Sequence, residues 1–290
     1  FRRVLFRSIW SNATLTPVER PAELAGKEFL TEQEAADYEK QTIQRNNADR
    51  RDGGADADVG RAYNEAWYDR GTRVVPTLRT SLVIDPPDGH VPALTAEGQA
   101  RGAAIRQATA GHQNDGPEGR SLAERCLVWP NAGPPMLSSF YNNNYQVVQS
   151  PGYVAIQIEN IHDVRMIPTD GSAHLPQSVR QWLGDPRGHW EGETLVVDTT
   201  NFTGKTAFRG ASSHLHLTER FTRTSAETIL YEFTVDDPET WTKPWTAQLV
   251  MGPAPGEIYE YACHEVNYGL ANSLSAARAE EKQTSAARSK

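Results

Sequence analysis

The segment Thr228–Val235 reads TILYEFTV, and its apolar side chains recur at every second position, at Ile229, Tyr231, Phe233 and Val235. Successive side chains of a β-strand point to opposite faces of a sheet. A period of two is therefore the pattern of a strand with one buried face. This segment predicts a strand, and it sets the class of fold that the rest of the chain is expected to join.

Short segments of the same kind recur after Leu127, rich in aromatic and β-branched residues and bounded by turn sequences. The predicted strands are Gln146–Gln149, Tyr153–Glu159, Asp163–Ile167, Thr194–Thr199, His216–Arg223, Thr228–Val235, Thr246–Met251 and Ile258–Cys263. About eight antiparallel strands without helices between them favour a meandering sheet that closes into a lipocalin-like barrel. A two-sheet sandwich is the alternative.

The mainly β region is expected to be one of several parts of the chain. Residues 126–272 are predicted to form the barrel core, and residues 9–125 a mixed, partly helical extension packed against it or over one mouth. The last part, residues 273–290, is rich in alanine and charged residues. It is expected to be a helix that frays into disorder.

Two sequence signals predict helices in the N-terminal extension. Thr31 and Glu34 have the spacing of a capping box, in which each side chain accepts a hydrogen bond from the other residue's backbone N–H. This motif predicts a helix over Glu32–Arg45. Thr95 is expected to cap a second helix that runs to about Ala108.

The first eight residues, Phe1–Ser8, are expected to be a non-native artefact. Arginines interrupt each apolar run of FRRVLFRS, and no small-residue cleavage site follows, so the segment lacks the architecture of a signal peptide. The letters LFRS are also the translation of the sequencing-adapter sequence CTCTTCCGATCT. Native sequence is expected to begin near Ile9, with any native signal peptide missing.

The composition of the chain argues against nucleic acid as a binding partner and against a membrane span. The 290-residue chain is 38% hydrophobic and 23% charged, and its formal net charge is −8. An acidic chain without a basic stripe is not expected to bind nucleic acid. No apolar run approaches the roughly 18 residues that a membrane helix needs, so no membrane span is predicted.

Several longer motifs occur together in this chain. They are Glu124–Cys126 (ERC), Asn131–Met136 (NAGPPM), Trp182–Phe202 (WLGDPRGHWEGETLVVDTTNF), Leu215–Phe221 (LHLTERF) and Tyr259–Glu265 (YEYACHE). From about Trp10 to Glu281 the chain resembles a large, mostly uncharacterised family of secreted bacterial and metagenomic proteins. The resemblance implies a periplasmic or extracellular location and leaves the reaction open.

Cys126 and Cys263 are the two cysteines of the chain. In a secreted protein an even pair suggests one disulfide. The bond would close a loop of about 137 residues, which is worth up to about 5 kcal/mol in the chain-entropy description. The alternative is two buried free thiols in a cytosolic protein.

Any catalytic site is expected to be assembled from residues far apart in the chain. HExxH, GxSxG, GxGxxG, CxxC and P-loop motifs are all absent from the sequence. Three histidines lie on or beside predicted strands with other ionisable residues. The candidate catalytic residues are His162, Asp163, Arg165, His216, Glu219, Arg220, Glu260 and His264.

Strand alternation predicts which of these residues share a face. His216 and Arg220 would lie together on one face, opposite Glu219, and Glu260 would lie with His264. If the first face lined the barrel lumen, such charged groups would need to pair with one another or with a ligand. A paired cluster could act as general acid and base, with an arginine stabilising an anion.

Two other interpretations of these histidines stay open. Histidine beside glutamate and arginine on a strand is also typical of a structural hydrogen-bond network. His162, His216 and His264 could instead hold a divalent metal in the three-ligand arrangement of catalytic zinc. No other cofactor is expected.

A polar and aromatic segment suggests where a ligand would bind. Tyr141, Asn142, Asn143 and Asn144 concentrate amide groups in a predicted loop, and Trp190 is one of several tryptophans that could line a pocket for sugars or aromatic ligands. Each feature also has a plain structural interpretation, as an asparagine turn or as core packing.

These observations favour an exported enzyme that acts on a small organic molecule in a barrel pocket. Acid–base chemistry of the lyase, isomerase or hydrolase type, without a nucleotide cofactor, is the leading hypothesis. The alternatives are a non-catalytic carrier or sensor, a metal-dependent enzyme, and a structural partner in an envelope assembly. Two histidines and a carboxylate in an open pocket would favour the enzyme, and a sealed apolar lumen the carrier.

Overall fold

The computed structural model describes residues 7–61, 64–205 and 208–288. The strands are β1 (Arg7–Ser11), β2 (Val83–Asp85), β3 (Asn144–Ser150), β4 (Tyr153–Ile158), β5 (Val164–Pro168), β6 (Asp185–Glu191), β7 (Thr194–Thr200), β8 (His216–Ser225), β9 (Thr228–Asp236) and β10 (Trp245–Pro253). The α-helices are α1 (Glu32–Asn46), α2 (Gly54–Gly60), α3 (Ala96–Thr109) and α4 (Tyr268–Arg288).

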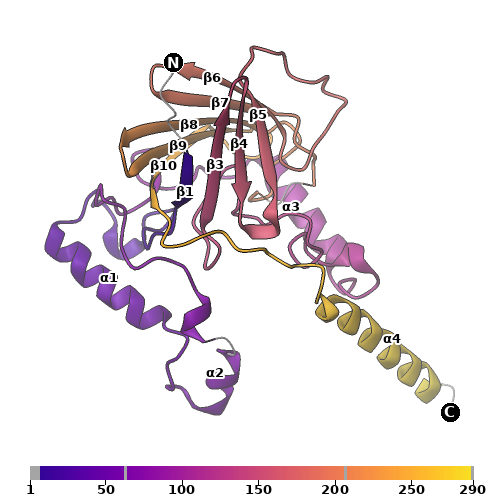
Figure 1. The fold of residues 1–290 in the computed structure, drawn as a ribbon. Coiled ribbons are helices and arrows are strands. Elements are labelled where there is room, and N and C mark those ends of the chain that lie inside the picture. Colours follow the sequence, from indigo (N-terminus) through magenta and orange to yellow (C-terminus); the bar gives the residue numbers. More distant parts are fainter. Residues whose placement is uncertain (1–6, 62–63, 206–207, 289–290) are drawn as a thin grey trace.

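The strands form one antiparallel sheet that curls almost into a closed barrel (Figure 1). Their order is β5-β4-β3-β1-β10-β9-β8-β7-β6, and β2 pairs with β10 outside this path. The predicted antiparallel barrel is confirmed. The end strands β5 and β6 approach closely, since a Cβ atom placed on Gly188 of β6 would lie 2.8 Å from Ile167 Cγ2 of β5.

Strand β6 is not among the strands predicted from the sequence. Its residues pair with β7 along their whole length, from Asp185 opposite Thr200 to Glu191 opposite Thr194. Proline is tolerated because β6 is an end strand and needs no hydrogen bond on its outer side. The glycine at position 188 provides space for β5 rather than a turn.

The predicted strand Ile258–Cys263 is wrong, because these residues form irregular structure. Strand β10 ends at Pro253 and already has β9 on one side and β1 and β2 on the other, so no free edge remains for another strand. We call residues 254–267 the strap. It crosses the outside of the molecule between β10 and α4 (Figure 1).

The sheet also takes strands from residues 9–125, the segment predicted as an extension. β1 lies between β3 and β10, with Trp10 opposite both Tyr145 and Pro253. The predicted artefact falls on residues 1–8. Residues 1–6 of that segment lie outside the described residues, and the other two belong to β1.

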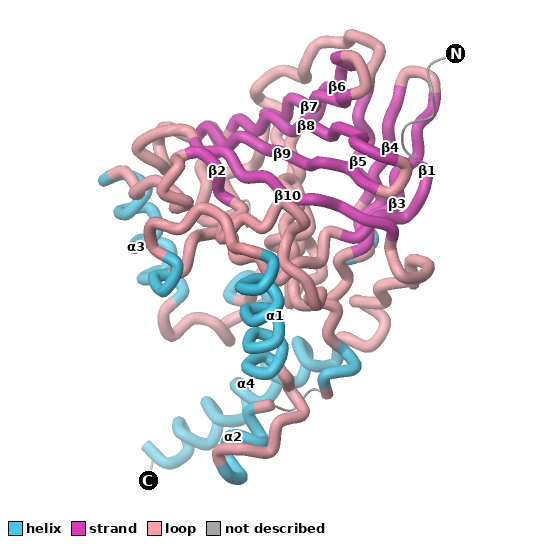
Figure 2. Tube along the Cα trace, turned by 90° about the vertical axis from the view of Figure 1, so that its left-hand side faces the viewer, coloured by secondary structure: helices cyan, strands magenta, loops and turns pink. Residues whose placement is uncertain are grey.

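The helices lie outside the barrel, and α1, α2 and α4 lie beyond one end of it (Figure 2). The capping box of α1 is confirmed: the Glu34 N–H donates to Thr31 Oγ1 over 3.3 Å, and the Thr31 N–H donates to Glu34 Oε2 over 2.8 Å. The predicted cap Thr95 starts α3. In the described residues, no helix combines the length and the apolarity that crossing a bilayer requires.

The barrel interior is packed with side chains. Inward positions of adjoining strands supply a continuous apolar core, which includes Tyr231 of β9 and Trp245 of β10. The loop before β3 inserts Met136 into this core, where its backbone N–H donates to the Tyr231 hydroxyl over 3.0 Å. Asn12 Nδ2 donates to the Met136 carbonyl over 3.3 Å. This loop therefore fills part of the space that an open barrel would offer to a ligand.

Candidate ligand-binding pocket

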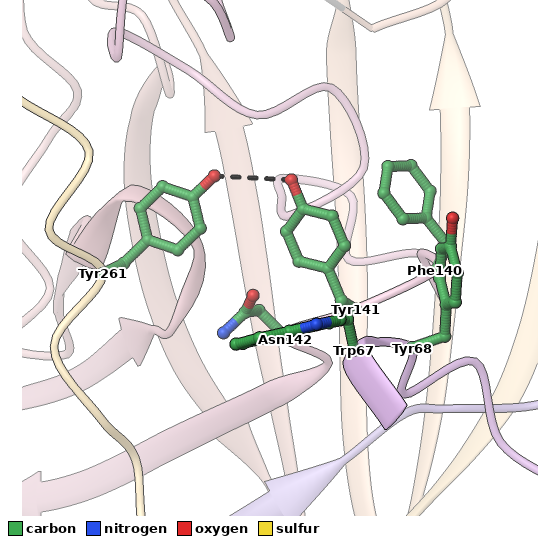
Figure 3. A pocket seen from close by; sticks show the side chains of 6 residues that line it. All are labelled: Trp67, Tyr68, Phe140, Tyr141, Asn142 and Tyr261. Atoms are coloured by element: carbon green, nitrogen blue, oxygen red, sulfur yellow. Dashed lines mark hydrogen bonds between the residues drawn. The ribbon is translucent and has the colours of Figure 1, made fainter. Parts of the chain in front are cut away.

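An aromatic pocket of about 450 Å³ lies where three distant segments meet (Figure 3). Its lining residues are Trp67, Tyr68, Phe140, Tyr141, Asn142 and Tyr261. Tyr261 comes from the strap and faces Tyr141 across the pocket, and their hydroxyl oxygens are 3.5 Å apart. We call this cavity the aromatic pocket.

The rings on one side of the pocket pack against one another. The Phe140 and Tyr141 ring centroids are 4.5 Å apart in edge-to-face geometry, and Tyr68 approaches Phe140 at 6.1 Å. Trp129 supports both central rings, at 5.8 Å from Phe140 and 5.3 Å from Tyr141. Such contacts between rings stabilise a particular arrangement of the wall.

The three asparagines of the predicted ligand-binding loop have different positions. Asn142 lines the pocket, and its φ of 55° is a left-handed conformation that asparagine tolerates. Asn143 is buried, and its side chain bonds within the loop and to the Asp69 carbonyl. Asn144 Nδ2 donates to Glu159 Oε2 over 2.8 Å. The last two therefore hold the loop rather than line the pocket.

A strained turn between β4 and β5 holds the asparagine loop through a hydrogen bond. Ile161 has φ of 61° and His162 has φ of 45°, which is costly for a β-branched residue above all. Asn160 Nδ2 donates to the Asn142 carbonyl over 3.0 Å. Strain of this kind persists only where the surrounding structure imposes it, and it is common at functional sites.

One buried and two half-buried carboxyl groups lie next to the pocket loop. Glu159 is 4% exposed, and burial raises the pKa of its carboxyl despite hydrogen bonds from Asn144 and Asn142. Burial also raises the pKa of Asp69, which follows Tyr68, and of Asp163 in the strained turn. No basic side chain is among the described residues that line the pocket.

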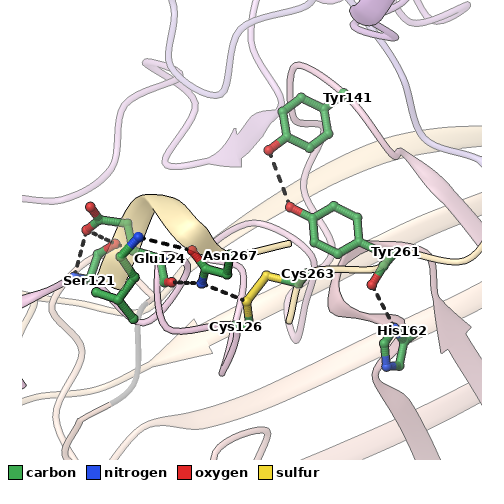
Figure 4. The surroundings of a disulfide bond; sticks show 9 residues. Ser121, Glu124, Cys126, Tyr141, His162, Tyr261, Cys263 and Asn267 are labelled. Atoms are coloured by element: carbon green, nitrogen blue, oxygen red, sulfur yellow. Dashed lines mark hydrogen bonds between the residues drawn. A yellow bond between two sulfur atoms is a disulfide. The ribbon is translucent and has the colours of Figure 1, made fainter. Parts of the chain in front are cut away.

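The predicted disulfide between Cys126 and Cys263 is confirmed, and it fixes the strap beside the pocket (Figure 4). Asn267 Nδ2, at the C-terminal end of the strap, donates to the Glu124 carbonyl over 2.8 Å. His162 Nδ1 lies 3.1 Å from the Tyr261 carbonyl and donates to it. These three contacts place the Tyr261 ring.

The predicted catalytic residues do not come together in one site. His162 lies on the backbone side of Tyr261, outside the pocket lining, and Asp163 lies beside it in the turn (Figure 4). Glu260 and His264 are exposed on the strap. Their expected common strand face is wrong, because this part of the chain is irregular.

Arg165 and Glu219 form an ion pair inside the barrel. Their side chains are 1% and 0% exposed, and Arg165 Nη1 donates to Glu219 Oε1 over 3.0 Å. The Tyr231 hydroxyl donates to the same carboxylate over 2.7 Å. Burial, and then the charge of Glu219, raise the pKa of Tyr231. The Tyr231 hydroxyl also accepts a hydrogen bond from the Met136 N–H. This network therefore connects β5, β8 and β9 to the inserted loop that contains Met136.

The expected lumen face of β8 is wrong. Leu217, Glu219 and Phe221 are buried, so His216 and Arg220 point outward. The apolar face lies inside, because burying Leu217 and Phe221 removes more apolar surface from water than burying the face with His216 would. Arg220 Nη2 donates to Glu191 Oε2 over 2.7 Å on this outer surface.

The outward histidine belongs to a chain of ionisable side chains. His216 Nε2 is 2.5 Å from Asp198 Oδ2, and His174 Nε2 is 3.0 Å from Asp198 Oδ1. His174 Nδ1 is 3.0 Å from Asp185 Oδ2. The hydrogen bond with Asp198 raises the pKa of His216, and the same bond lowers the pKa of Asp198. Within the described ranges, no three His, Cys, Asp or Glu residues are grouped so as to hold a metal ion.

The pocket includes residues that the sequence did not single out together. Trp190, predicted to bind a ligand, lies on β6, packs against the barrel core and is not among the described residues of this lining. Tyr68, Phe140 and Tyr261 lie in the lining without having been predicted there. Two signals were present: an aromatic pair directly before the asparagines, and a tyrosine two residues before a cysteine.

Comparison with protein-family models, with curated proteins and with solved structures finds no match to this chain.

Proposed function

We propose that the protein binds a small organic molecule in the aromatic pocket and acts as an exported carrier or sensor. The observation that carries this proposal is the pocket lining, in which five of the six described residues are aromatic. Pockets for small molecules are typically about 300–1,000 Å³ and are lined mostly by apolar and aromatic side chains with few polar groups. The aromatic pocket has this size and composition.

The way the pocket is held supports the same function. Its segments are far apart in the chain. The disulfide fixes the strap, the strained turn holds the loop of residues 140–142, and the ring contact of Tyr68 with Phe140 joins the first segment to that loop. A pocket fixed before binding loses less conformational entropy when the ligand enters. The disulfide also supports export, since disulfides persist mainly in oxidising compartments.

Binding can be tested by calorimetry with a panel of sugars, phenols and organic ammonium ions. We expect at least one class to bind, and Tyr261→Ala to weaken its binding by about tenfold or more. Tyr259→Ala is the matched control, because Tyr259 lies on the same strap but is 73% exposed and outside the lining. Equal effects of the two substitutions, or no binding by any class, would refute the proposal.

The second candidate is an acid–base enzyme of the lyase, isomerase or hydrolase type. It is favoured by one observation: Asp198 orients the imidazole of His216, whose Nδ1 bonds to none of the described residues. A carboxylate that fixes a histidine is a recurring feature of general bases. Turnover of a ligand found by binding, abolished by His216→Gln without loss of that binding, would support it. Unchanged turnover in His216→Gln would exclude this histidine.

A further inference from the structure

We infer that the aromatic pocket selects an organic cation that carries a quaternary or substituted ammonium group. This inference rests on the proposed binding function and names the class of ligand. The face of an aromatic ring carries partial negative charge, and several rings around one cavity are a recurrent way to bind ammonium groups. Among the described residues, five aromatic side chains and one amide, that of Asn142, line this cavity.

Some polar groups of the described lining already face partners within the protein. The hydroxyls of Tyr141 and Tyr261 face each other at 3.5 Å, and the Asn142 side chain lies near the Glu159 carboxylate. A sugar needs several donors and acceptors at defined positions. A cation needs mainly ring faces and nearby negative charge. The lining therefore fits a cation better than a sugar.

The segments that form the pocket are acidic. Their carboxylates are Glu65 and Asp69 around the first aromatic pair, Glu159 behind Asn142, and Glu257, Glu260 and Glu265 on the strap. The strap contains no lysine or arginine. Negative charge around a cavity attracts cations and raises their local concentration.

One of the rings already binds a cation from the protein itself. The Arg70 guanidinium carbon lies 3.8 Å from the centroid of the Tyr68 ring, and Arg70 Nη2 lies 3.6 Å from a Glu65 carboxylate oxygen. The Tyr68 ring therefore forms a cation–π contact with Arg70, and the Glu65 carboxylate balances the charge of Arg70. Burial raises the pKa of both Glu159 and Asp69.

Choline and its neutral isostere 3,3-dimethylbutan-1-ol test this inference, because they differ by one nitrogen in place of one carbon. Calorimetry of the full chain is expected to show choline binding about tenfold or more tightly, the size of a desolvated cation–π contribution. The affinity for choline should fall as salt is added, whereas that for the isostere should not.

Two lining substitutions locate the binding site. Trp67→Leu and Tyr261→Leu are each expected to weaken choline binding about tenfold, since each removes a ring face. Tyr259→Leu should leave it unchanged. Trp67 is 69% exposed, so its replacement leaves the core intact, and a thermal unfolding curve confirms that each variant is folded.

The outcomes separate the inference from the proposed function. Equal affinity for the two compounds overturns selection for a cation but keeps a pocket that binds small molecules. Choline binding that neither lining substitution weakens places the cation elsewhere and also overturns the inference. If neither compound binds, the inference fails, and the panel of sugars and phenols decides separately whether the pocket binds any ligand.

Discussion

At the scale of single residues, ionisable side chains of this barrel have opposite environments on its two faces. Arg165 and Glu219 are fully buried and bonded to each other. Arg220, the next residue on β8, points to solvent and pairs with Glu191. Two residues that are neighbours in the sequence can therefore contribute very differently to stability, because the dielectric environment of each ion pair sets the strength of its interaction.

We expect Arg165→Ala to destabilise the protein by about 3–5 kcal/mol, because it leaves the Glu219 carboxylate buried without its partner. Arg220→Ala is the matched control and should cost less than about 1 kcal/mol, as for other exposed ion pairs. Urea unfolding measures both. The double variant Arg165→Met, Glu219→Leu should recover much of the loss. Similar costs for the two single substitutions would contradict this account.

The contact between His216 and Asp198 should make stability depend on pH. The folded-state pKa of His216 lies above its ordinary 6.5, so its stabilisation is complete below 6.5 and is lost as the pH rises through the raised pKa. The pKa of Asp198 lies below its ordinary 3.8, so its stabilisation is complete above 3.8 and is lost as the pH falls through the lowered pKa. Asp236 and His174 also lie near this pair.

The advantage in Tm of the natural chain over His216→Gln should therefore shrink from about pH 6 to about pH 9. Thermal unfolding of both proteins across this range measures the difference, and NMR titration of His216 checks its raised pKa. A difference in Tm that is constant with pH would show that the contact contributes nothing through proton linkage.

At the scale of elements, a glycine allows β6 to lie close to β5, and a cysteine fixes the strap. In β6, Gly188 allows β5 to approach within van der Waals distance at the seam of the barrel. A Cβ atom there would also lie 3.0 Å from Thr169 Cγ2. Beyond the hydrogen bond of Ala254 to Ile9 of β1, the strap forms no strand, so its position depends on the disulfide and on a few hydrogen bonds.

Gly188→Ala is expected to cost about 1–3 kcal/mol, the usual range for overpacking, because the seam must open to hold the added methyl group. Gly252→Ala in β10 is the control, since a Cβ atom at that position meets no atom within 4 Å. Denaturant unfolding compares the two. If Gly188→Ala is no more destabilising than Gly252→Ala, the strands at the seam can separate freely.

Removing the disulfide by Cys126→Ser with Cys263→Ser is expected to lower stability by up to about 5 kcal/mol and to weaken ligand binding. Both effects follow because the strap would lose its main tether beside Tyr261. Unfolding and binding curves measure them. In the natural chain, a thiol titration of the unfolded protein should find no free thiol, and a value near two per chain would contradict the bond.

At the scale of the whole molecule, the barrel serves as a scaffold rather than as a container. Its interior is packed with side chains and with the inserted Met136 loop, whereas the aromatic pocket is built from loops and the strap. Helix α4 projects away from the body (Figure 2). No side chain described over residues 268–287 is buried.

Removal of residues 271–290 should therefore change the free energy of unfolding by less than about 1 kcal/mol, since exposed segments contribute little. The deletion keeps both cysteines and the hydrogen bonds of Asn267 to the loop around Cys126. Denaturant unfolding and ligand binding measure its effect. A loss of several kcal/mol would mean that α4 packs on the body more extensively than its exposure indicates.

The sequence by itself determined the local features of this protein. Alternating residues such as those of Thr228–Val235 specify strands, Thr31 and Glu34 specify the start of a helix, and a single pair of cysteines specifies the disulfide partners. Each of these signals lies within a few residues or within one pairing choice, so pattern and composition suffice to identify it.

Only the tertiary structure decided which face of β8 is inside, that β6 is a strand, and that Tyr261 meets Tyr141. Alternation defines two faces, but the apolar surface that the whole barrel can bury chooses between them. The aromatic pocket depends on chain segments up to about 190 residues apart, and no local pattern encodes their meeting.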